Sequence, residues 1–196
     1  WNQTPPIRER NRLEREPLVK PALGYGLRPV RNIAQGAVDL GDEVLHAPRL
    51  VLESPGLPAL GVAVCTLGEA LENRVEALFA ERRRLVAYEL DALGNDLLAH
   101  YQRLAAARME ALARRRGLCT GIEVSPGDDD LGLDQQPAVL RLADGFRHGI
   151  TITRSGMLKP AKSVTFVIAF GAHLAKPLLS RCERCGSRER CRHRAK

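Results

Sequence analysis

A leucine stripe between residues 90 and 112 constrains the fold of this chain more than any other feature. The stripe consists of Leu90, Leu93, Leu97, Tyr101, Leu104 and Leu112. This is the spacing of one face of an α-helix. Residues 114–116 are arginines, which suit the negative end of a helix dipole, and Gly117 is a typical C-terminal cap. The stripe therefore predicts one long helix that packs against a core.

The segment before this helix combines a strand pattern with a helix start. Residues 60–65 form an apolar run that is typical of a buried strand. Thr66 and Glu69 follow with the spacing of a capping box, which predicts that a helix begins there. A helical pattern continues to Phe79, and Arg82 to Arg84 indicate either a solvated face or a helix break.

Shorter patterns flank these elements. Residues 34–46 predict a short helix, and residues 50–52 predict an extended segment. Residues 133–142 predict a third helix, which Asp130 or Asp134 would cap and Gly145 would end.

The last part of the chain before the C-terminal segment has two strand patterns. Residues 148–153 and 163–170 are separated by a turn at residues 156–160, which predicts an antiparallel hairpin. The order of a strand, long helices, a short helix and two strands predicts an α+β fold with a mixed or antiparallel sheet.

Length and composition predict one main domain. The chain has 196 residues, of which 44% are hydrophobic, enough for one sizeable core. We expect an N-terminal arm or linker at residues 1–20, the α+β domain at 21–175 and a Cys/Arg-rich segment at 176–196. The sequence contains no apolar run of about 18 to 20 residues and no secretion signal, which predicts a cytoplasmic protein without a membrane partner.

The net charge of +7 is concentrated at the C-terminus. Residues 181–196 contain seven basic and two acidic residues, so the rest of the chain is nearly neutral. A basic patch confined to the last residues does not by itself predict nucleic acid as the main partner.

A cysteine cluster predicts a metal site in the C-terminal segment. Cys182, Cys185 and Cys191 can bring three thiolates to one ion or cluster. Zinc would need a fourth ligand such as His193, His173 or another cysteine. An iron–sulfur cluster would need Cys119 or Cys65 nearby. Cys119 lies in a predicted loop, whereas Cys65 ends a predicted buried strand, so Cys119 is the better candidate, and the spacing leaves the metal open.

Three segments in order resemble the activation-domain family of cobalamin-dependent methionine synthase, in a stand-alone form. They are Ala-Val-Cys-Thr-Leu-Gly at residues 63–68, Ser-Pro-Gly at 125–127, and residues 151–164, which include Thr-Arg-Ser at 153–155 and Pro-Ala-Lys-Ser-Val at 160–164. The resemblance covers roughly residues 20 to 175.

The resemblance implies a curved α+β domain that binds S-adenosylmethionine and caps a corrinoid carried by a partner. In that chemistry, inactive cobalt(II) takes one electron and then a methyl group, and the corrinoid itself does the reaction. The implied cofactor-binding residues are Thr66, Gly68, Ser125, Pro126, Gly127, Arg154, Ser155 and Lys162. The resemblance implies no catalytic residue, and it favours an iron–sulfur cluster over zinc because zinc has no redox chemistry.

Two positions depart from the family pattern. The family usually has an arginine shortly before the Ser-Pro-Gly segment and a tyrosine just after it, where this chain has Glu123 and Asp128. A carboxylate repels the methionine carboxylate that an arginine would bind, and an aspartate cannot stack as an aromatic ring can. These residues argue against the family's way of holding S-adenosylmethionine.

We therefore expect a partner of a corrinoid protein that supports reductive activation or methyl transfer. Whether the chain is itself an enzyme or a component of a methyltransferase system stays open at this point. The sequence has no nucleophile–base pattern and no phosphate-binding glycine loop, which argues against a self-contained hydrolase or kinase. Two alternatives remain: a zinc-containing nucleic-acid-binding protein that uses the arginine-rich tail, and a structural subunit of a methyltransferase complex.

Overall fold

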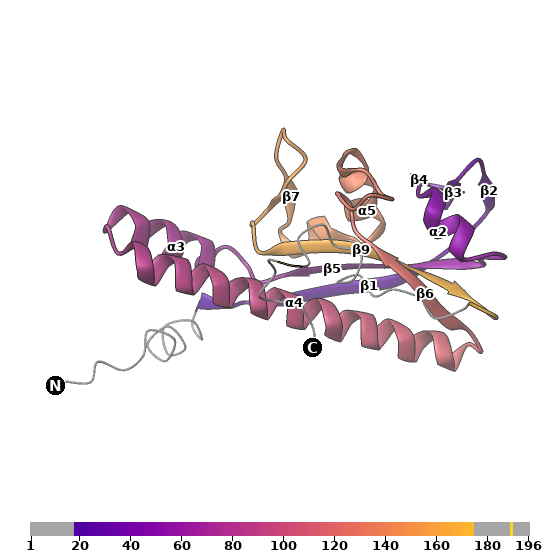
Figure 1. Ribbon diagram of the computed structural model, residues 1–196, viewed down its shortest axis with the longest axis horizontal. Coiled ribbons are helices and arrows are strands. Elements are labelled where there is room, and N and C mark those ends of the chain that lie inside the picture. Colours follow the sequence, from indigo (N-terminus) through magenta and orange to yellow (C-terminus); the bar gives the residue numbers. More distant parts are fainter. Residues whose placement is uncertain (1–17, 175–188, 190–196) are drawn as a thin grey trace.

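A four-stranded antiparallel sheet forms the centre of the molecule in the computed structural model, which describes residues 18–174 and residue 189. Its strands are β1 (Ala22–Pro29), β5 (Ala59–Thr66), β6 (Cys119–Val124) and β9 (Ser163–Gly171). They lie in the order β1-β5-β9-β6, so β5 and β9 are central (Figure 1). Both are almost fully buried because each face of the sheet is covered.

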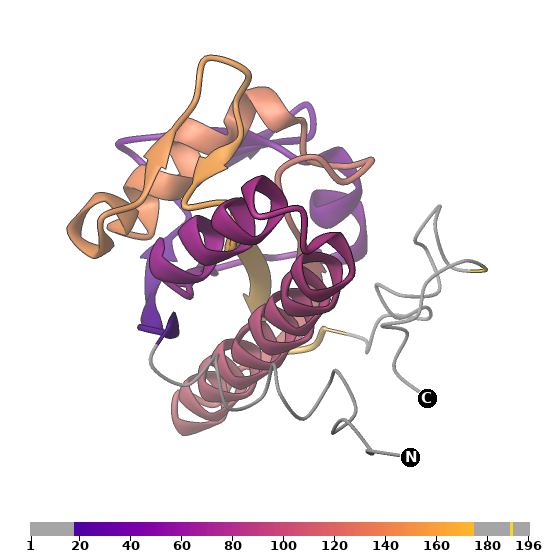
Figure 2. The same cartoon turned by 90° about the vertical axis from the view of Figure 1, so that its left-hand side faces the viewer.

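One helix covers one face of the sheet. It is α4 (Arg84–Arg115), which runs along the sheet, while α3 (Ala70–Ala80) packs against α4 near the end of the sheet (Figures 1 and 2). The core on this side contains Phe166 and Phe170 of β9 and Met109 of α4, all fully buried. The helices confirm the predicted long helix. Of the two interpretations of Arg82 to Arg84, the structure shows the helix break, because α3 ends at Ala80 and α4 begins at Arg84.

Short elements cover the other face (Figure 1). They are the small sheet β2 (Asn32–Ala34), β3 (Ala37–Asp39) and β4 (Val44–His46), the helices α2 (Pro48–Glu53) and α5 (Gln136–Leu142), 3₁₀ turns at Leu133–Gln135 and Gly145–His148, and the hairpin β7 (Thr151–Ile152) and β8 (Leu158–Lys159). Their buried side chains pack on Leu60, Val62 and Val64 of β5. The predicted α+β class with an antiparallel sheet is confirmed.

The predicted capping box at Thr66 is wrong. Helix α3 begins four residues later, at Ala70, and Glu69 at its N-cap makes no side-chain capping bond. The chain continues the sheet pairing through Leu67, whose N–H donates to Lys162 O and whose carbonyl accepts from Lys20 N. Gly68 then turns the chain with φ +79°, a conformation that favours glycine.

The leucine stripe lies on α4 as predicted, but leucines do not form most of the contact with the sheet. Leu90 is buried, whereas Leu93, Leu104 and Leu112 are only partly buried. The fully buried residues in the second half of α4 are Ala105, Met109 and Ala113. Two of these three residues are alanines, whose small side chains let the helix lie close to the sheet.

Two short-element predictions before β5 are wrong. Residues 34–46 are strands and not a helix, because Gln35 and Gly36 both have positive φ and make a tight turn between β2 and β3. Residues 50–52 lie in helix α2, which begins with Pro48, a residue suited to the first helical turn.

The predicted hairpin of residues 148–153 with 163–170 is also wrong. The first strand, β7, pairs with the two-residue strand β8, while β9 pairs with β5 and β6. The apolar run of β9 is buried on both faces, so it fits the centre of the sheet better than an exposed hairpin. Within the described ranges, no helix is long and apolar enough to cross a membrane.

Candidate functional site

Three of the implied ligand residues lie where β5 ends and β9 begins. Thr66 Oγ1 accepts a hydrogen bond from Gly68 N at 3.1 Å and lies 2.8 Å from Ser163 Oγ. Lys162 is 9% exposed, and its Nζ lies 2.6 Å from Asp91 Oδ1 and donates to Asn95 Oδ1 at 2.8 Å. These contacts join the sheet to α4 and leave little of Thr66 or Lys162 for a ligand.

The Ser-Pro-Gly segment forms a tight turn directly after β6. The Asp128 carboxylate accepts from Ser125 N at 2.8 Å, and Gly127 N donates to Leu131 O at 2.8 Å. Ser125 is 4% exposed, and its Oγ has no hydrogen-bond partner among the described residues. A buried hydroxyl without a partner is costly, so a ligand or water that reached it would be stabilised.

Arg154 and Ser155 lie in the tip that joins β7 to β8, and both are exposed. Thr153 Oγ1 lies 3.0 Å from Ser155 Oγ and accepts from Met157 N at 3.1 Å, which fixes the backbone of the tip. The Arg154 guanidinium can therefore reach an anionic or polar group presented from solvent.

Leu133 brings the Ser-Pro-Gly turn and the hairpin tip together. A Cβ atom added to Gly127 would lie 3.8 Å from Leu133 Cδ1, and one added to Gly156 would lie 3.3 Å from Leu133 Cγ. Two segments that lie about thirty residues apart in the sequence therefore meet on one apolar side chain. Thr66 and Lys162 make their contacts elsewhere, with Ser163 and α4.

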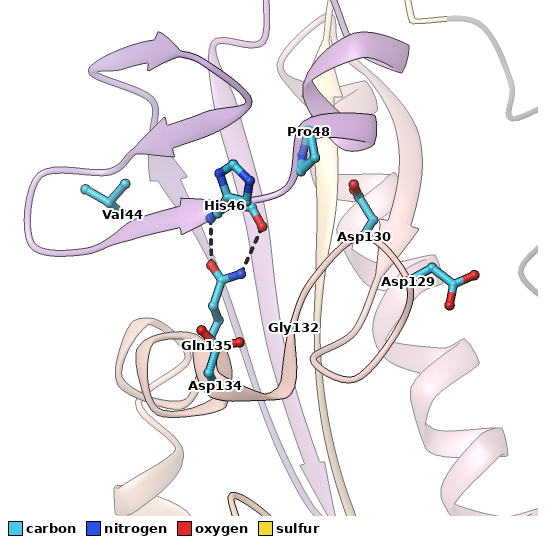
Figure 3. Close-up of a pocket in the computed structure, with 8 residues that line it drawn as sticks. All are labelled: Val44, His46, Pro48, Asp129, Asp130, Gly132, Asp134 and Gln135. Carbon is cyan, nitrogen blue, oxygen red and sulfur yellow. Dashed lines mark hydrogen bonds between the residues drawn. The ribbon is translucent and has the colours of Figure 1, made fainter.

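A cavity of about 550 Å³ lies beside this turn, between β4, α2 and the loop that precedes α5 (Figure 3). It is lined by Val44, His46, Pro48, Asp129, Asp130, Gly132, Asp134 and Gln135. None of the residues implied by the resemblance lines it.

Hydrogen bonds across this cavity correct the expected role of Asp130. It does not cap the helix that follows it, and neither does Asp134, because α5 has no side-chain cap. Its carboxylate instead accepts from the N–H groups of Arg49 and Leu50 in the first turn of α2. Sequence reasoning missed this role, although Pro48 is a usual signal for a helix start.

Gln135 makes a second link across the cavity. Its amide oxygen accepts from His46 N at 2.6 Å, and its amide nitrogen donates to His46 O at 2.9 Å (Figure 3). The Gln135 amide thus pairs with the backbone of His46 at the edge of β4, as a neighbouring strand would.

Glu123 lies on β6 and turns its carboxylate toward α4. It accepts a hydrogen bond from Gln102 Nε2 at 2.6 Å. On the same side of the sheet, burial raises the pKa of the Cys65 thiol to about 12, and the charge of Glu123 adds to the effect. Glu123 thus places a negative charge in the seam between α4 and the sheet edge.

The cysteines differ sharply in their availability. Cys65 is fully buried in the core between the sheet and α4, and burial raises the pKa of its thiol to about 12, so it lies where a core residue was expected. Cys119 is exposed at the start of β6, opposite Gly171 near the end of β9. Cys182, Cys185, Cys191 and His193 lie outside the described residues. Over residues 18–174, no group of three or more His, Cys, Asp or Glu side chains is placed to hold a metal.

The residues near the Ser-Pro-Gly turn offer few groups to S-adenosylmethionine. The Ser125 hydroxyl has no hydrogen-bond partner among the described residues, but it is buried. Glu123 is a carboxylate, so it cannot donate a hydrogen bond to the carboxylate of an amino acid. Lys162 does not replace the missing cation because Asp91 and Asn95 already hold it.

Comparison with known proteins shows the fold. No family model and no curated protein matches this sequence. The chain is similar to a crystal structure of the MetH reactivation domain bound to AdoHcy, with a TM-score of 0.60 and 17% sequence identity. The likeness covers 89% of this chain and 65% of that one. The chain thus has a mixed α/β fold like that of the reactivation domain.

Proposed function

We propose that this protein is a partner of a corrinoid protein and supports reductive activation or methyl transfer of its cobalamin cofactor. The observation that carries the proposal is the fold likeness to the MetH reactivation domain over 89% of the chain. The corrinoid supplies the redox and methyl chemistry when the partner is bound. The residues of this chain would bind and orient that partner.

The proposed contact surface is the face of the sheet that carries α5 and the β7–β8 hairpin. The hairpin stands out from the sheet (Figure 1). Met157, in the loop between β7 and β8, is 57% exposed, and Leu133, which lies against the hairpin, is 36% exposed. Exposed apolar groups next to Arg154 and Ser155 suit a partner surface with apolar and polar parts.

In this proposal, residues 1–20 form an arm and residues 21–175 form the domain. Residues 176–196 would add a cysteine-bound iron–sulfur cluster. Cys119 supports this proposal as the fourth ligand beside Cys182, Cys185 and Cys191. It is exposed, and it pairs with Gly171, only eleven residues before Cys182. Zinc is the alternative, and anaerobic analysis of iron, zinc and sulfide in wild type and Cys119→Ser distinguishes the two metals.

A reactivation assay tests the proposal. A corrinoid-binding domain loaded with cob(II)alamin is mixed anaerobically with the protein, titanium(III) citrate and S-adenosylmethionine. We expect faster loss of the cobalt(II) absorbance than in a mixture without the protein. Complex formation without any change in cobalt state would instead indicate a structural subunit.

A further inference from the structure

The second half of α4 carries a cluster of exposed arginines, which we call the arginine face. Its members are Arg103, Arg108, Arg114, Arg115 and Arg116. Glu110 is the one acidic residue in the sequence from 97 to 116, and it pairs with Arg114 at 2.6 Å. The other four arginines have no ion pair within residues 18–174. Five arginines and one glutamate give residues 103–116 a net charge of +4.

The arginines of α4 form two rows on opposite flanks of the helix. Arg108 and Arg115 lie seven residues apart, which is close to two helical turns, so they share one flank. Arg103 and Arg114 lie eleven residues apart, which is close to three turns, so they share the other flank. The two rows are therefore separated by about the diameter of a helix with its side chains, roughly 10 to 12 Å.

The ridge between the two rows contains small side chains. Ala107 and Ala111 lie there, on the side of α4 opposite Met109, which is fully buried toward the sheet. No large hydrophobic side chain is exposed between residues 103 and 116. A protein interface or a membrane contact needs apolar groups at its centre. A surface that is strongly positive and lacks them suits a nucleic-acid backbone better.

The chain runs toward a second basic segment from the same end of the molecule. Cys119 comes directly after α4 and pairs with Gly171 near the end of β9 (Figure 1). Leu174 lies against β6, since a Cβ atom added to Gly121 would be 2.9 Å from its Cδ1. Residues 181–196, with seven basic and two acidic residues, follow in the sequence. Positive charge is therefore added to the chain a few residues after it leaves the end of α4 and the sheet.

We propose that the arginine face of α4 binds the backbone of double-stranded DNA without sequence preference. Guanidinium groups bind phosphates in a bidentate manner. The separation of the two rows is close to the roughly 12 Å width of the major groove, so each row faces the phosphates of one strand. The alanine ridge turns no hydrogen-bonding side chain toward the bases, so it reads no sequence. This surface lies on the other side of the sheet from the β7–β8 hairpin (Figure 1).

Fluorescence anisotropy of the full-length protein with a labelled DNA duplex of about 20 base pairs tests the inference, because such a duplex is longer than the face. We expect the logarithm of the association constant to fall linearly with the logarithm of the salt concentration, with a slope of about −3.6 or steeper for four phosphate contacts. The dissociation constant should then rise at least about a hundredfold between about 50 and about 200 mM salt. No binding, or binding that salt does not weaken, overturns the inference.

The double variant Arg108→Gln/Arg115→Gln removes one row. We expect the slope to become shallower by about 1.8 and the dissociation constant to rise by more than about tenfold at low salt, because two phosphate contacts are lost. Arg108→Lys/Arg115→Lys keeps both charges and should keep the slope. The matched control is Arg84→Gln/Arg147→Gln, which removes two exposed arginines at the start of α4 and in the 3₁₀ turn on the other face. We expect it to leave the slope unchanged.

The same titrations separate the arginine face from other sources of binding. A slope that survives Arg108→Gln/Arg115→Gln with unchanged circular dichroism would assign DNA binding to the C-terminal segment and overturn the inference. Equal losses in this variant and in Arg84→Gln/Arg147→Gln would show an effect of net charge alone and would overturn it as well. An RNA duplex of the same length should bind more weakly, because its major groove is too narrow for a helix, and equal affinity for the two duplexes contradicts the groove geometry.

Discussion

The carboxylate of Asp130 holds the backbone of Leu50, eighty residues earlier in the chain. Asp130 Oδ2 accepts the N–H of Leu50 at 2.8 Å, and Oδ1 accepts the N–H of Arg49 at 2.7 Å. The first amides of a helix have no partner within the helix, so an acidic side chain there both accepts their hydrogen bonds and suits the helix dipole. The contact joins the loop after the Ser-Pro-Gly turn to α2.

Removal of this contact should destabilise the fold. We expect Asp130→Ala to lower the free energy of unfolding by about 1 to 2 kcal/mol, because two amide groups lose a charged acceptor. Urea denaturation followed by circular dichroism measures the change. Asp129→Ala, at the exposed neighbouring position, should change stability by less than about 0.5 kcal/mol. Equal effects of the two substitutions would contradict the capping role.

Gly61 should not tolerate a methyl group. A Cβ atom at this position of β5 would overlap the Phe170 ring and lie 3.0 Å from Met109 Sδ, both fully buried. We expect Gly61→Ala to cost about 2 to 3 kcal/mol, because overpacking forces α4 away from the sheet. Gly56→Ala is the control, because no atom lies within 4 Å of the Cβ that it adds. The backbone at Gly56 has a φ of +67°, so we expect this substitution to destabilise the fold through backbone strain alone, and by less than Gly61→Ala does. An unchanged melting temperature for Gly61→Ala would show that the helix does not pack this closely.

Lys162 should act on stability more than on ligand binding. Lys162→Met loses the contacts with Asp91 and Asn95, and we expect a loss of roughly 1 kcal/mol because the Asp91 side chain is partly exposed. Lys159→Met, on exposed β8, is the control. If Lys162→Met abolished nucleoside binding and left urea denaturation unchanged, Lys162 would be a ligand residue and not a structural one.

Cys65 should make stability fall at alkaline pH. Its folded pKa of about 12 lies above the value of roughly 8.5 expected for an unfolded chain. As the pH rises, the thiol therefore ionises in the unfolded state before it ionises in the folded state. The stability that the protonated thiol contributes is fully present below about pH 8.5 and is lost as the pH rises toward 12. At pH 10.5 we expect the free energy of unfolding of the wild type to be about 2.5 kcal/mol lower than at pH 8. Cys65→Ala should remove this pH-dependent loss of stability. Cys119→Ala should keep it, because Cys119 is exposed. Urea denaturation at pH 8 and at pH 10.5 measures the difference.

The periodic signals in the sequence predicted the large elements well. The stripe from Leu90 to Leu112 predicted α4, and the apolar run at 60–65 predicted β5, since both depend on burial patterns that are local in sequence. The short elements failed where long-range contacts decide the conformation. Residues 50–52 are helical because Asp130 caps α2, and no local pattern contains that information.

The candidate site was harder to predict than the fold. The Ser-Pro-Gly turn and the hairpin tip do meet, but they meet through Leu133, which sequence reasoning assigned only to a helix. Thr66 and Lys162 were expected to hold a ligand, yet their polar atoms contact Ser163, Asp91 and Asn95. A motif identifies polar residues, but only the packing around them shows which atoms remain available to a ligand.

Binding of a corrinoid protein to the face that carries the β7–β8 hairpin is the interaction that we propose for this chain. Sedimentation velocity that follows the absorbance of a cob(II)alamin-loaded corrinoid domain measures this binding. We expect a heavier species with wild type, its loss with Met157→Asp at the hairpin, and its retention with Leu52→Asp, which alters an exposed leucine of α2 at the other end of the same face (Figure 1). A corrinoid domain that sediments alone in the presence of the wild-type protein would show that the proposed interaction does not form.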